Sequence, residues 1–204
     1  FSISPDGGTV AFEWRQGGDW QVYLVDSRGE GEPRRLVEID DPCGAPEYSR
    51  DGRYLYFARD DRGSECFDIY RCDVESGACE NLLPDTPGLS ISLDFDLSPD
   101  GERLAFAVAH GQSYAAAVMP AAVSPRGEAV RLLADHYCND WAPDWAPDGR
   151  HLVFQSDTHG QDGAAVVAGA DDGTCLLYTS DAADYLPCLY LGGPRLIKKT
   201  HPSP

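Results

Sequence analysis

Residues 98–106 read SPDGERLAF, and three other stretches of the chain repeat this pattern. They are SPDGGTVAF at 4–12, SRDGRYLYF at 49–57 and APDGRHLVF at 146–154. The four stretches start 45, 49 and 48 residues apart, and in each a Phe follows the glycine of an Asp-Gly pair by five residues. The shared residues are Asp6, Gly7 and Phe12; Asp51, Gly52 and Phe57; Asp100, Gly101 and Phe106; and Asp148, Gly149 and Phe154. A repeat of this period predicts a chain built from one kind of structural unit.

Each repeat reads as four short β-strands. The Asp-Gly pair is typical of a tight turn, in which glycine supplies a positive φ. After the turn, Leu104 and Phe106 alternate with other residues and so share one face of a strand. A polar loop, a strand such as FDIYRCD at 67–73, a short strand and an entry strand such as 93–97 complete the unit. This pattern predicts an all-β fold, a β-propeller of four-stranded antiparallel blades, because a single blade cannot bury both of its faces.

The repeat resembles that of TolB-like β-propellers, over residues 1–174. The same repeat builds the N-terminal propeller of prolyl-oligopeptidase-family serine peptidases, and the segments 60–88 and 141–158 look more similar to those peptidase propellers. The resemblance implies a non-catalytic propeller that gates or positions peptide substrates for an α/β-hydrolase domain. The alternative it implies is a TolB-like propeller that acts as a protein-binding scaffold.

The resemblance also implies further blades, because propellers of this family close with more than the four repeats found here. The first residues, FSISPDGG, read as the inside of a strand followed by a turn, so we expect the N-terminus to be cut within the domain. The expected partners are therefore a peptide substrate or a protein partner, together with the remaining blades and a hydrolase domain outside this sequence.

Residues 175–204 differ in composition from the rest. Both lysines, Lys198 and Lys199, lie there, whereas the preceding repeats use only arginine. The stretch CLLYTSDAAD at 175–184 resembles the translated end of a transposase-based sequencing-library adapter. We expect 1–174 to be a partial propeller and 175–204 to be a non-native tail, the alternative being a natural C-terminal strand.

Composition excludes some partners. The net charge of −18 argues against a nucleic-acid-binding face, because phosphate contacts need clustered Lys and Arg. No apolar run approaches the ~20 residues of a membrane span. The seven cysteines include no CxxC pair, so we expect no zinc site. Cys72 and Cys79 flank a short polar turn and could be either a disulfide or two free thiols.

No catalytic, metal-binding or cofactor-binding residue is expected. A nucleophile elbow reads G-x-S-x-G, and its nearest match, GQSYA around Ser113, lacks the second glycine. The acidic loops at 60–65 and 157–163 could hold calcium, but turn-forming Asp and Gly account for both. Histidines show no metal-ligand spacing, and His151 is expected to be an exposed strand residue. Trp141, in a link between repeats, is the candidate binding residue at the propeller rim.

Three functions remain, and the peptidase propeller is favoured over the scaffold. A propeller that is itself a lyase or glycosidase is the least supported, because we expect no carboxylates or metal ligands to converge in repeat register. A downstream G-x-S-x-G domain would select the first function. A signal peptide and a small N-terminal α/β domain would select the second.

Overall fold

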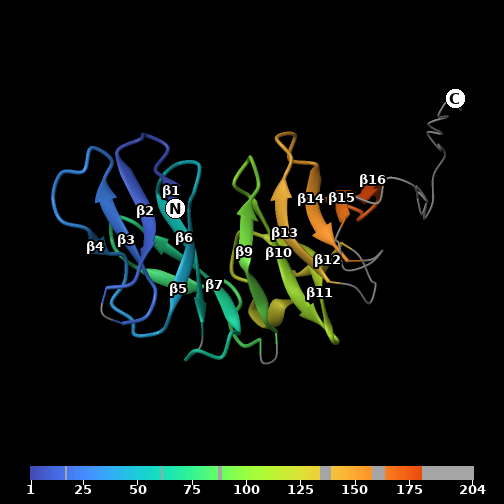
Figure 1. The fold of residues 1–204 in the computed structure, drawn as a ribbon, viewed down its shortest axis with the longest axis horizontal. Coiled ribbons are helices and arrows are strands. Elements are labelled where there is room, and N and C mark those ends of the chain that lie inside the picture. The colour runs from blue at the N-terminus through green and yellow to red at the C-terminus, as the bar shows by residue number, and fades with distance from the viewer. Residues whose placement is uncertain (17, 61, 87–88, 134–138, 158–163, 181–204) are drawn as a thin grey trace, which may run out of the picture.

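The computed structural model describes residues 1–16, 18–60, 62–86, 89–133, 139–157 and 164–180 (Figure 1). These residues form an almost entirely β structure, whose one helix in the described part of the chain is the 3₁₀ turn η1 (Pro125–Gly127). None of the described helical residues forms a segment long and apolar enough to cross a membrane. The expected all-β fold class is confirmed.

Each repeat forms four strands, here called a blade. Blade 1 contains β1 (Ser2–Ile3), β2 (Thr9–Trp14), β3 (Gln21–Asp26) and β4 (Arg34–Arg35). Blade 2 contains β5 (Cys43–Tyr48), β6 (Tyr54–Asp60), β7 (Phe67–Asp73) and β8 (Cys79–Asn81). Blade 3 contains β9 (Ile91–Leu97), β10 (Arg103–His110), β11 (Ser113–Pro120) and β12 (Arg131–Leu132). Blade 4 contains β13 (Asp140–Trp145), β14 (His151–Ser156), β15 (Ala164–Gly169) and β16 (Cys175–Ser180).

Within each blade the strands pair antiparallel in chain order. Blades 1 and 4 are separate four-stranded sheets, whereas blades 2 and 3 join into one eight-stranded sheet. The join is the single pairing of Phe67 with Ile91. In Figure 1 the described blades stand side by side in an open row and do not close into a ring.

The Asp-Gly turn is held by its own side chains. The Ser98 hydroxyl donates to Asp100 Oδ1 over 2.5 Å, and the same oxygen accepts the Glu102 N–H over 3.0 Å. Gly101, with φ of +76°, donates its N–H to the Ser98 carbonyl. The hydrogen bond from the Ser98 hydroxyl, followed by that from the Glu102 N–H, lowers the pKa of Asp100. Asp100 is therefore engaged in holding the turn between β9 and β10.

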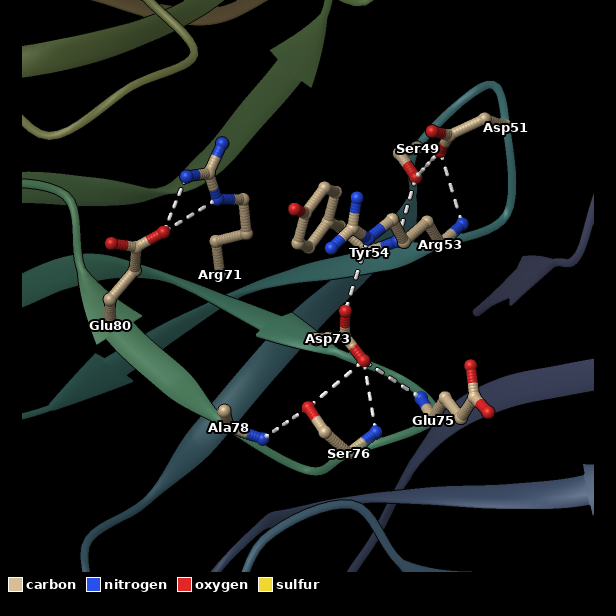
Figure 2. Close-up of polar contacts among 10 residues, drawn as sticks. All are labelled: Ser49, Asp51, Arg53, Tyr54, Arg71, Asp73, Glu75, Ser76, Ala78 and Glu80. Atoms are coloured by element: carbon tan, nitrogen blue, oxygen red, sulfur yellow. Dashed lines mark hydrogen bonds and ion pairs between the residues drawn. The ribbon is translucent and has the colours of Figure 1, made fainter.

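The same contacts recur at Ser4 and Asp6 and at Ser49 and Asp51, the latter pair drawn in Figure 2. The fourth turn differs because Ala146 has no hydroxyl. There His151 Nδ1 lies 2.5 Å from Asp148 Oδ2, and the His151 N–H donates to Asp148 Oδ1 over 3.1 Å. His151, which we expected to be exposed, is half-buried and fastens this turn.

The hydrophobic cores lie between blades. Leu104 and Phe106 face blade 2, in a cluster that includes Ile69 and Leu82. Ala105, between them in the sequence, faces blade 4 and packs in a second cluster with Trp145. Equivalent positions alternate in the same way between blades 1 and 2. The strands β6 and β10 thus bury one face against the preceding blade and the other against the next.

The β7–β8 hairpin of blade 2 carries a disulfide between Cys72 and Cys79, which are directly opposed in the sheet. Beside it, Asp73 accepts the N–H and hydroxyl of Ser76 over 2.9 and 3.0 Å, and Arg53 over 3.1 Å (Figure 2). The Ser76 N–H, followed by Arg53, lowers the pKa of Asp73 to about 2. The disulfide settles which of the two expected states these cysteines adopt in the structure.

We predict that Gly173→Ala destabilises the chain by roughly 3 kcal/mol, through a left-handed backbone and a steric clash together. Gly173 has φ of +68°, and a Cβ there would overlap the carbonyl oxygen of Leu133 in blade 3. Gly7 is the matched control, since its φ is +72° but no heavy atom lies within 4 Å of a Cβ. Gly7→Ala should cost only about 1 kcal/mol, the left-handed strain alone. Urea unfolding measures both, and equal losses would contradict the clash.

Candidate functional site

The first strands of neighbouring blades, β1, β5, β9 and β13, are connected by a repeated hydrogen bond. Ser2 Oγ accepts the Tyr48 N–H over 3.1 Å. Both carboxylate oxygens of Glu47 accept the Leu97 N–H, over 3.1 and 3.2 Å. Asp96 Oδ2 then accepts the Trp145 N–H over 2.6 Å. In each case a side chain two residues before the repeat's first residue holds the next blade by its backbone.

The surroundings of Glu47 and Asp96 disfavour the charged form of a carboxyl group. Burial, and next the charge of Asp96, raise the pKa of Glu47 to about 8. Burial also raises the pKa of Asp96, with Asp144 adding to the shift. Arg50 and the donated N–H groups act in the opposite direction on both carboxyls. Glu47 is therefore largely protonated at neutral pH.

The expectation that no carboxylates converge in repeat register is wrong. Glu47, Asp96 and Asp144 stand at equivalent positions of three successive repeats. The charges of Asp96 and Asp144 help to raise the pKa of Glu47, and the charge of Asp144 helps to raise the pKa of Asp96. The sequence did not reveal this row of acids because blade 1 has Ser2 at the equivalent position. Among the described residues, no group of three His, Cys, Asp or Glu is arranged to hold a metal ion. The contacts of Glu47 and Asp96 make them blade-to-blade acceptors.

Two clefts lie at opposite ends of the blades. At the turn end, a cleft of about 460 Å³ is bounded by Arg50, Asp96 and Trp145. The Arg103 guanidinium lies over the Trp145 ring, 4.5 Å from its centroid. At the opposite end, where second strands lead into third strands, a larger cleft measures about 530 Å³. We call it the loop-end cleft, and its described lining is Glu65, Phe67, Ile91, Ser92, Tyr114, Asn139, Asp140, Trp141 and Asp157.

Trp141, the candidate binding residue, lines the loop-end cleft. Its indole N–H donates to Gln155 Oε1 over 2.5 Å. The pairing of β13 with β14 shifts just after Trp141, at Ala142, whose φ is +48°. Ala45 in β5 has the same conformation at the same repeat position, again before a proline and an acid. Such bulges re-aim side chains in a sheet and store backbone strain near sites of function.

A polar network fixes the wall of the loop-end cleft between blades 3 and 4. Asn139 donates its N–H to Asp157 Oδ1 over 2.7 Å and its amide group to Asp157 Oδ2 over 2.9 Å. Asn139 Oδ1 accepts the Tyr114 N–H over 3.1 Å. Asp140, fully buried, accepts the Ala116 N–H over 3.2 Å. The wall is therefore preorganised, and its aromatic residues stand on anchored strands.

The other residues singled out from the sequence lie elsewhere. Ser113 begins β11, opposite His110 in a hairpin, whereas a nucleophile elbow requires a strand-to-helix turn. In the 60–65 loop, Asp60 accepts the Ser64 hydroxyl over 3.3 Å and the Glu65 N–H over 3.0 Å, so it orders the loop itself. Residues 158–163 of the second acidic loop lie outside the described residues, as do 181–204 of the expected tail. The backbone of β16 pairs with β15 as the fourth strand of blade 4.

Comparison with known proteins finds no matching family model. An uncharacterized protein of Agrobacterium fabrum is 31% identical over 157 residues, which are 76% of this chain and 49% of that protein. The chain thus spans about half the length of this curated relative.

Comparison with solved structures identifies the fold. A protein described as a TolB of Agrobacterium tumefaciens superimposes with a TM-score of 0.69 and 26% identity, over 85% of this chain and 62% of that one. A puromycin-hydrolyzing peptidase of Mycobacterium tuberculosis gives a TM-score of 0.67 and 20% identity, over 90% of this chain and 29% of the peptidase. The repeats, the blades and these likenesses agree, and the chain has the fold of a TolB-like β-propeller.

Proposed function

We propose that this propeller is a non-catalytic module that binds a peptide or a segment of a partner protein in the loop-end cleft. The observation that carries the proposal is the position of Trp141 in that cleft, beside Tyr114 and Phe67. Aromatic side chains supply much of the binding energy at such surfaces at low cost in side-chain entropy. The anchored wall formed by Asn139 and Asp157 adds preorganisation, which favours binding further.

Selection of random octapeptides displayed on phage tests this function. We expect the chain to enrich specific sequences and Trp141→Ala to lower their affinity at least about tenfold, as for an aromatic hot spot. Trp20→Ala is the matched control, because Trp20 is 51% exposed on blade 1 and does not line the cleft. Failure to enrich any sequence, or equal losses in the two variants, would remove the support for this site.

A second candidate is the propeller of a prolyl-oligopeptidase-like serine peptidase, gating or positioning peptides for an α/β-hydrolase domain. The likeness to the puromycin-hydrolyzing peptidase over 90% of this chain favours it. The identity of 26% to the TolB structure, against 20% to the peptidase, favours the scaffold role instead. Both candidates place a peptide on the propeller, so the binding proposal is common to them.

Sequencing the source DNA across and beyond the codon for Thr174 separates the candidates. Further Asp-Gly repeats followed by a G-x-S-x-G domain would select the peptidase. Such a continuation would also support our proposal that 175–204 is a non-native tail and that further blades follow 174. A genomic sequence that encodes CLLYTSDAAD would contradict the tail proposal.

A further inference from the structure

The loop-end cleft is negatively charged and has no compensating cation in its described lining. Glu65, Asp140 and Asp157 contribute carboxylates, and none of the described lining residues is Arg, Lys or His. The chain as a whole carries a net charge of −18, which adds to the negative potential. A cationic group entering this cleft would meet carboxylates in a partly desolvated setting, where electrostatic attraction is stronger than in bulk water.

The same cleft presents aromatic surface. Phe67, Tyr114 and Trp141 come from three different blades and all line it. A cation over an aromatic face is attracted by the ring's negative face, and Trp gives the strongest interaction of this kind. Carboxylates combined with aromatic faces therefore select a cation with a flat or apolar surface over a strongly hydrated one.

We propose that the loop-end cleft binds an arginine side chain of a peptide or partner protein. This inference rests on the proposed binding function and names the chemistry of its ligand. A guanidinium is planar, so it stacks on an aromatic ring while its N–H groups pair with a carboxylate in two parallel hydrogen bonds. An ammonium group is more strongly hydrated and lacks that flat face.

Glu65 is the carboxylate best placed to pair with the guanidinium. Asp157 already accepts two hydrogen bonds from Asn139, and Asp140 accepts one from Ala116. Glu65 lies on the exposed β6–β7 loop, where its N–H is held by Asp60 over 3.0 Å. Its backbone is thus held in place at the edge of the cleft, where Glu65 is one of the lining residues, and the two aspartates supply background charge.

Titration with small probes, followed by NMR of the Trp141 indole N–H, tests the proposal. The probes are N-acetyl-argininamide, its neutral isostere N-acetyl-citrullinamide, and alanyl-alaninamide, which offers only a free α-amine. We expect the arginine probe to bind with a Kd of about 1 mM, and the citrulline probe about tenfold more weakly. Raising the salt concentration should weaken binding of the arginine probe and leave binding of the neutral citrulline probe unchanged.

One variant and its control test whether Glu65 supplies the carboxylate that binds the arginine probe. Glu65→Gln should weaken the arginine probe at least about threefold and leave the citrulline probe unchanged. Glu38→Gln is the control, because Glu38 is a highly exposed surface acid whose ion pair with Arg35 lies in blade 1. Unchanged amide spectra of both variants show that each has folded.

The proposal is overturned if citrulline binds as tightly as arginine, if Glu65→Gln has no effect, or if the free α-amine binds as well as the guanidinium. The proposed binding function is tested separately, by the peptide selection. Selected peptides that depend on Trp141 but carry no arginine would preserve that function and remove this inference. Absence of any Trp141-dependent peptide would remove the function itself.

Discussion

Phe106→Ala is expected to destabilise the chain by about 3–5 kcal/mol, the range for truncating a fully buried aromatic side chain. Phe106 is 0% exposed and packs in the cluster between blades 2 and 3. Its removal leaves a cavity between blades 2 and 3, which cannot both move inward because blade 2 also packs on blade 1 and blade 3 on blade 4. Urea unfolding at fixed pH measures the loss.

Phe12→Ala is the matched control for that variant. Phe12 occupies the same repeat position in blade 1, but it is only half-buried. Its ring centroid lies 6.3 Å from that of Trp14 and 6.1 Å from that of Tyr23. We expect a loss of about 1 kcal/mol there. Similar losses at both positions would mean that the interblade packing is not the main source of stability.

Glu47→Gln is expected to remove a pH dependence of stability between about pH 4.5 and pH 8. The folded pKa of Glu47 is about 8, whereas its ordinary value is 4.5. The unfolded chain therefore releases this proton first, so stability is full below pH 4.5 and falls as the pH rises toward 8. The loss from this group is on the order of 3 kcal/mol, allowing for partial solvent access.

Glutamine keeps an oxygen to accept the Leu97 N–H but cannot ionise. The variant should therefore match the wild type near pH 4.5 and exceed it in stability at pH 8, as measured by urea unfolding at both pH values. Glu38→Gln, at an exposed acid, should leave the slope unchanged. A wild type whose stability does not fall over this interval would show that Glu47 ionises without cost.

The blade architecture could be predicted from the sequence because the turn residues and the core residues of each repeat lie within one short stretch, such as 98–106. Asp100 and Gly101 form a local turn whose chemistry is readable within six residues, and Leu104 and Phe106 alternate directly after it. The resulting fold class agrees with the structure. The bulges at Ala45 and Ala142 were not predicted, since alanine at positive φ has no sequence signature of its own.

The blade-to-blade acceptors were missed for a different reason. Glu47 and Leu97 are 50 residues apart, and their contact needs the packed neighbouring blade. A carboxylate next to an aromatic or aliphatic residue in a strand reads as ordinary alternation. The loop-end cleft is likewise assembled from three blades, so Trp141 could be selected from the sequence, but its companions Glu65 and Tyr114 could not.

The hydrogen bond between first strands also bears on how such a chain can change length during evolution. Each repeat brings both a side chain that receives an amide, such as Glu47 or Asp96, and an amide to be received, such as that of Leu97 or Trp145. Duplication or loss of a whole repeat therefore leaves every donor matched with an acceptor. An insertion of half a repeat would bury an amide without a partner, which costs about 1–3 kcal/mol. Selection on this contact favours growth and shrinkage in complete units.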